Sequence, residues 1–79
     1  MIEKRAAPRR RVLKGATITF AGAGIACTVR NLSATGAGLE VADPLILPPS
    51  FMLVIESDKA VHRCHRVWSN EHRVGVAFD

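Results

Sequence analysis

Short runs of apolar and β-branched residues alternate with Gly, Pro, Asn and Asp along the chain, and helical periodicity is hard to find. The runs predict six strands, at residues 16–20, 25–32, 38–41, 51–56, 60–68 and 74–78. The region between the third and fourth strands is predicted to be a loop, because its prolines cannot donate to a strand ladder; they are Pro44, Pro48 and Pro49. Six short strands in a small domain are best protected from edge-to-edge pairing when the sheet closes. The pattern therefore predicts an all-β fold, a small six-stranded antiparallel β-barrel.

Charge is distributed unevenly and divides the chain in two. Residues 1–14 contain six basic residues and one acidic residue, whereas residues 15–79 contain five basic and six acidic residues. We expect a basic N-terminal arm at residues 1–14, flexible without a ligand because it has little apolar content, and one barrel domain at residues 15–79. The charge of the arm indicates an anionic partner.

The apolar runs and the cysteines indicate the compartment. No run approaches the roughly 18 apolar residues of a membrane-spanning helix, and the basic start is not followed by the apolar stretch of a secretory signal. Cys27 and Cys64 each lie in an apolar strand pattern, and two thiols make no disulfide framework of the secreted kind. We expect a soluble cytoplasmic protein with buried, reduced cysteines and no membrane insertion.

Two segments carry residues suited to binding an anion or a nucleotide. The first is the arginine-rich arm, since guanidinium groups hold phosphate oxygens and the O6 and N7 edge of guanine. The second is the turn that contains Asn31, Ser33 and Gly36, where an amide, a hydroxyl and a bare backbone can meet a ligand. Taken alone, the arm is more simply read as a solvated basic tail and the second segment as an ordinary turn.

Taken together, the two segments resemble the PilZ domain family. That family combines an Arg-x-x-x-Arg arm, here Arg5 to Arg9 with Arg10 next, and an Asp/Asn-x-Ser-x-x-Gly turn, here residues 31–36. The stretches 66–68 and 75–78 also resemble the last two strands of the family, so the likeness covers nearly the whole chain. The run of arginines lets the register slide, because Arg10 and Lys14 have the same spacing, but only Arg5 and Arg9 match with arginine at both ends.

The resemblance implies a split-barrel type of fold that binds cyclic di-GMP, a bacterial second messenger, often as a stacked pair, with the arm folding over the ligand. It further implies a receptor that presents a new surface to a downstream protein partner. The residues that the resemblance assigns to the ligand are Arg5, Arg9, Arg10, Asn31, Ser33 and Gly36. Many members continue into a C-terminal helix, whereas this sequence ends at Asp79.

Trp68 and Arg66 share strand parity, which places them on one face of the fifth predicted strand. The indole of Trp68 could stack on a purine, or it could pack in the core or at the rim of the barrel. Arg66 is an extra ligand contact or, more simply, a surface arginine.

Other chemistry finds little support in the sequence. Alternation separates His65 from His62 and Cys64, so we expect no metal site. No nucleophile has a base and an orienting group nearby, so we expect no enzyme activity and no cofactor. Two alternatives stay open: a nucleic-acid-binding β-barrel, disfavoured because the chain has only three Phe, one Trp and no Tyr for stacking, and a degenerate PilZ domain that serves as a protein-interaction module.

Overall fold

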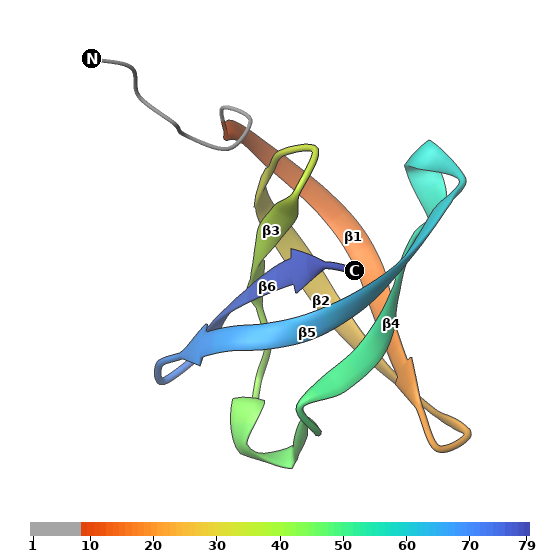
Figure 1. The fold of residues 1–79 in the computed structure, drawn as a ribbon, viewed down its shortest axis with the longest axis vertical. Coiled ribbons are helices and arrows are strands. Elements are labelled where there is room, and N and C mark those ends of the chain that lie inside the picture. Colours follow the sequence, from red (N-terminus) through yellow and green to blue (C-terminus); the bar gives the residue numbers. More distant parts are fainter. Residues whose placement is uncertain (1–8) are drawn as a thin grey trace.

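The computed structural model describes residues 9–79 and shows a closed barrel of six antiparallel strands (Figure 1). The neighbours around the barrel are β1-β2-β3-β6-β5-β4, with β4 pairing back onto β1. The predicted six-stranded antiparallel barrel is confirmed. Its elements are β1 (Arg10–Phe20), β2 (Ala23–Leu32), β3 (Gly36–Glu40), the 3-10 turn η1 (Pro44–Ile46), β4 (Ser50–Ile55), the 3-10 turn η2 (Glu56–Asp58), β5 (Ala60–Ser69) and β6 (Arg73–Phe78).

β1 is twice as long as the sequence pattern predicted, because it begins at Arg10 instead of residue 16. Ala21 and Gly22 form a two-residue turn in which both have positive φ, 50° and 79°, the geometry of a tight hairpin. This turn aligns β1 with the whole of β2, so that even Arg10 pairs, with Leu32. Residues 10–14, which the charge pattern assigned to the arm, therefore lie in the first strand.

The core is filled by alternate residues of all six strands. The largest side chains that are essentially inaccessible to solvent are Ile18, Val29, Leu39, Leu53, Ile55, Cys64 and Val74. Cys27 and Cys64 are free and buried, as predicted. Burial raises the pKa of each thiol to about 11, so both are neutral at physiological pH.

Polar contacts hold η2, and the segment that follows η1, against the barrel. The Lys14 ammonium, on β1, lies 2.7 Å from the Asp58 carboxylate at the end of η2, and this hydrogen bond lowers the pKa of Asp58. At the other turn, the backbone N–H of Arg66 donates to the carbonyl of Pro49 and its guanidinium to that of Leu47, at 2.8 Å and 3.0 Å. Among the described residues, no helix is long and apolar enough to cross a membrane.

Candidate ligand-binding site

One row of residues crosses the outer surface of the barrel and contains most of the candidate chemistry. Strand register places Arg11 of β1 opposite Asn31 of β2, Asn31 opposite Gly38 of β3, Gly38 opposite Gly75 of β6, and Gly75 opposite Trp68 of β5. The row faces outward because the residues that flank the two glycines along their strands point into the core; these are Ala37, Leu39, Val74 and Val76. We call these five residues the binding row.

Two β-bulges bring Asn31 and Trp68 into this row. Val29 and Asn31 of β2 pair with Leu39 and Gly38, which are adjacent in β3, so one extra residue of β2, Arg30, lies between the two pairs. Val29 therefore faces the core while Asn31 faces outward. The same irregularity separates Arg66 from Trp68 opposite β6. Bulges re-aim side chains in this way and occur often beside functional sites.

The expectation that Arg66 and Trp68 share a face is wrong, because the bulge between them interrupts the alternation. Arg66 pairs with Val76, a core residue, and its guanidinium turns toward the carbonyl of Leu47. Trp68 pairs with Gly75 and keeps 46% of its surface exposed. Trp68 is therefore a surface residue of the binding row, and Arg66 stabilises the loop before β4.

The side chains of Asn31 and Trp68 lie directly on the two glycines. A methyl group on Gly38 would come within 2.5 Å of Nδ2 and 2.9 Å of Oδ1 of Asn31. A methyl group on Gly75 would overlap Nε1 of Trp68 and lie 2.8 Å from its Cδ1. The amide and the indole thus rest against bare backbone at neighbouring positions of β3 and β6.

The arginines before and at the start of β1 diverge in direction. Arg9 donates from Nη1 to Oδ1 of Asn31 at 2.9 Å, which joins the two motifs that the sequence singled out. Arg10 pairs with the inward-facing Leu32, and its positive charge acts on Asp58 at the end of the barrel. Arg5, the other arginine of the motif, lies outside the described residues.

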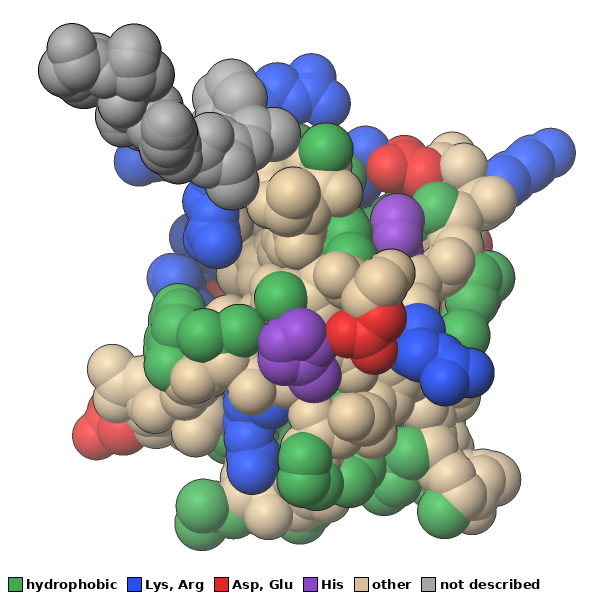
Figure 2. Space-filling view, in the orientation of Figure 1, with side chains coloured by type: hydrophobic (Ala, Val, Ile, Leu, Met, Phe, Trp, Pro, Cys, Tyr) green, Lys and Arg blue, Asp and Glu red, His purple; other side chains and the backbone are tan. Residues whose placement is uncertain are grey.

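Beside the binding row lies a basic hollow of about 460 Å³, which Arg11, Arg30, Asn31 and Arg73 line. Arg30 is paired with Glu40 at 2.7 Å, and it is the one arginine of the three that forms an ion pair within residues 9–79. In the space-filling view, several Lys and Arg side chains gather on the side of the barrel near the start of β1 (Figure 2). The hollow suits an anion such as a phosphate.

Sequence reasoning did not single out Arg30 and Arg73 as site residues. They lie far apart in the chain and belong to no short motif. β3 brings them together, because Glu40 is opposite Arg73 in the sheet and holds Arg30 by its side chain. Only strand pairing reveals this arrangement.

Ser33 and Gly36 have local structural roles in the β2–β3 turn. The Ser33 hydroxyl accepts a hydrogen bond from the N–H of Thr35 at 3.2 Å, and the Ser33 N–H donates to the carbonyl of Gly36 at 2.9 Å. A methyl group on Gly36 would overlap the carbonyl oxygen of Val76 and lie 3.3 Å from Cα of Ala77. Gly36 therefore allows β3 to approach β6 closely. The β2–β3 turn connects the strands in a register that places Asn31 opposite Gly38.

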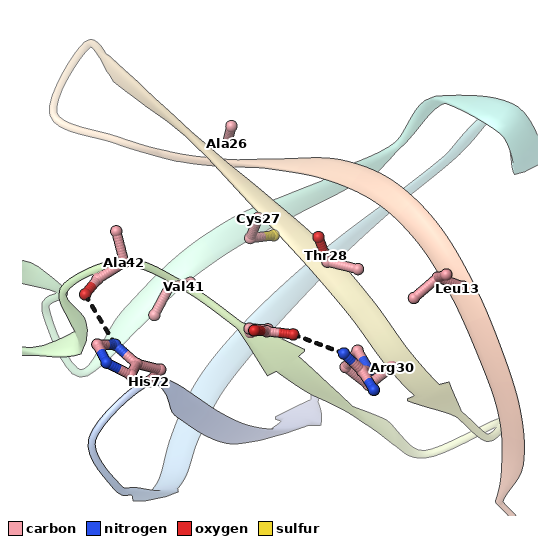
Figure 3. A pocket seen from close by; sticks show the side chains of 9 residues that line it. Leu13, Ala26, Cys27, Thr28, Arg30, Val41, Ala42 and His72 are labelled. Carbon is pink, nitrogen blue, oxygen red and sulfur yellow. Dashed lines mark hydrogen bonds and ion pairs between the residues drawn. The ribbon is translucent and has the colours of Figure 1, made fainter.

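A second hollow, of about 490 Å³, lies where β3 separates from β2 (Figure 3). The chain after β3 is held to the β5–β6 turn by the Val41 N–H, which donates to the carbonyl of His72, and by the His72 ring, whose Nδ1 lies 3.1 Å from the carbonyl of Ala42. Cys27 lines this hollow, but its neutral thiol is a poor nucleophile. This second hollow shares Arg30 with the basic hollow, and the residues that line it offer no catalytic grouping.

The histidines near Cys64 point in different directions, as the alternation predicted for His65. Cys64 is in the core, whereas the His65 ring is exposed and its Nδ1 lies 2.7 Å from Oδ1 of Asp79. His62 stacks on the ring of Phe78, with centroids 3.9 Å apart. Within residues 9–79, no three metal-binding side chains lie close enough together to hold an ion.

Comparison with known proteins gives one match. The model of the PilZ domain family matches residues 3–79, which is nearly the entire chain. No curated protein and no solved structure matches the chain.

Proposed function

The chain belongs to the PilZ domain family, and on that premise we propose that it is a bacterial receptor that binds cyclic di-GMP along the binding row. One observation carries the proposal: the fold brings Asn31, to which Arg9 is hydrogen-bonded, and Trp68 onto the same outer surface, at opposite ends of a glycine pair. Domains of this family are binding modules. The role proposed is accordingly ligand binding, without catalysis or a cofactor.

The chemistry of cyclic di-GMP suits these residues. Its guanines present flat faces and an O6 and N7 edge, and its phosphodiesters are anionic. The exposed part of the Trp68 indole provides a stacking surface, and Arg9 provides paired donors for a guanine edge or a phosphate. The basic hollow with Arg11 and Arg73 provides a further place for a phosphate.

We propose that the N-terminal segment closes over the bound ligand and brings Arg5 to it. Arg9 supports this idea, because it directly precedes β1 and its side chain already reaches Asn31. Closure would change the surface around the row and so signal to a downstream protein. This role implies a cytoplasmic protein.

Calorimetric titration of the full chain with cyclic di-GMP tests the proposal. Arg9→Ala should weaken binding by roughly tenfold or more, because a hydrogen bond to a charged group contributes about 1.5–3 kcal/mol. The Arg5→Ala/Arg9→Ala double variant should abolish binding without unfolding the barrel. Arg63→Ala is the matched control, since Arg63 is exposed on β5 opposite Met52 of β4 and lies outside the row.

The contrary results are equally clear. No heat above the dilution control, at ligand concentrations of several hundred micromolar, would reject a receptor for cyclic di-GMP. Equal weakening by Arg63→Ala would indicate attraction to net charge rather than a specific site. Titration with single-stranded DNA at two salt concentrations tests the nucleic-acid alternative, because binding to a strand weakens steeply with salt.

A further inference from the structure

We propose that Gly38 and Gly75 are positioning residues, which hold the Asn31 amide and the Trp68 indole in place for a planar purine ligand. The two glycines are paired with each other across β3 and β6, at the centre of the binding row. The inference rests on the proposed function, because it assigns to these glycines a part in binding the same ligand.

Backbone conformation does not explain these glycines. Gly22 is the one described glycine with positive φ, and it lies in the β1–β2 turn. Glycine inside a strand is destabilising by roughly 0.5–1 kcal/mol relative to alanine, so two of them side by side need another reason.

The surroundings of the glycines supply that reason. At Gly15 no atom lies within 4 Å of an added methyl group, and at Gly24 such a group would make an ordinary contact of 3.5 Å with Thr17. At Gly38 and Gly75 the added group meets side chains, the amide of Asn31 and the indole of Trp68. These two positions are therefore bare because side chains of the binding row occupy the space above them.

This arrangement fixes the two ends of the site. The Asn31 amide is held from below by Gly38 and from the side by Arg9. The Trp68 indole rests on Gly75 with part of its surface open. Three strand spacings of about 4.8 Å separate the backbones of Asn31 and Trp68 by roughly 14 Å, and the amide and the indole extend over the two glycines between them. A purine that stacks on the exposed part of the indole would therefore have the indole between itself and Gly75.

The test compares Gly75→Ala with Gly15→Ala, the same change in open space on β1. In the ligand-free chain, Gly75→Ala should lift the indole from the backbone, so that iodide quenches Trp68 emission more strongly. Its affinity for cyclic di-GMP should fall by roughly fivefold or more, as expected when one base–aromatic stack is lost. Gly15→Ala should leave both quenching and affinity unchanged.

A double-mutant cycle with Trp68→Ala separates positioning from general damage. If Gly75 acts through Trp68, then Gly75→Ala will not weaken binding further in the Trp68→Ala background. Gly38→Ala provides a second variant, which should weaken binding while leaving the quenching of Trp68 unchanged.

The outcomes distinguish the two proposals. If the wild-type chain does not bind cyclic di-GMP, both fail. If it binds and Gly75→Ala binds equally well, or if the two losses of affinity simply add, the positioning role of Gly75 is wrong while the proposed function stands.

Discussion

Gly36→Ala is predicted to destabilise the protein even without a ligand. Gly36 belongs to the Asn-x-Ser-x-x-Gly motif, so loss of binding in this variant would ordinarily be read as loss of a ligand contact. The structure gives a different reason, because an added methyl group would overlap the carbonyl oxygen of Val76 and lie 3.3 Å from Cα of Ala77. Both are backbone atoms, which cannot rotate away, so β3 and β6 would have to separate.

The magnitude follows from the cost of overpacking. Forcing extra carbon into a tightly packed site costs about 1–3 kcal/mol, and for a domain of this size each kcal/mol shifts the melting temperature by about 4–8 °C. Gly36→Ala should therefore melt roughly 4–24 °C below the wild type. Gly15→Ala is the matched control; an added methyl group there meets nothing within 4 Å, so loss of freedom in the unfolded chain should stabilise it by about 0.4–1 kcal/mol.

Thermal unfolding of both variants, followed by circular dichroism without ligand, measures the difference. Urea unfolding checks that the denaturant dependence is unchanged and that the comparison reflects stability alone. If Gly36→Ala is as stable as Gly15→Ala, the close approach of β3 to β6 does not require glycine. A ligand contact would then be the remaining explanation for this residue.

Three further predictions concern stability and its dependence on pH. Leu53→Ala, at a fully buried position, should cost about 2–5 kcal/mol in urea unfolding, and a loss below about 1 kcal/mol would contradict the closed core. Cys27 and Cys64 should resist an aromatic disulfide reagent until the protein unfolds. Because burial raises the pKa of each thiol from 9.0 to about 11, the free energy of unfolding should fall as the pH rises between these values. This fall should be smaller in the variant with alanine at both positions. Asp58, whose pKa the Lys14 hydrogen bond lowers below its usual 3.8, contributes stability above that value that is lost as the pH falls through its folded-state pKa. Urea midpoints in acid should therefore fall less steeply for Asp58→Asn than for the wild type, and parallel curves would contradict the ion pair.

Short apolar and β-branched runs separated by turn residues were enough to predict the fold class. Runs such as residues 16–20 and 51–56 predict strands, and six short strands in so small a chain are best protected when the sheet closes. The same local pattern placed both cysteines in the core. These features depend on neighbours in sequence, which is why they could be predicted.

The length of β1 could not be read in the same way. Its first five residues are mostly basic, as expected of a solvated arm. The tight turn at Ala21 and Gly22 nevertheless sets them in register with β2. A strand can be specified by its partner when its own composition does not specify it. The charge pattern therefore identified the basic segment without showing where the sheet begins.

The sequence identified some residues of the candidate site, and the tertiary structure was needed for the rest. Short motifs in the sequence identified Asn31 and Arg9, because their spacing is local and typical of the PilZ family. Only the tertiary structure put Trp68, Gly75 and Arg73 on the same surface, since register between distant strands is set when the barrel closes. Two β-bulges completed the arrangement by reversing the alternation before Asn31 and Trp68, and strict alternation from the neighbouring core residues would have turned both side chains inward.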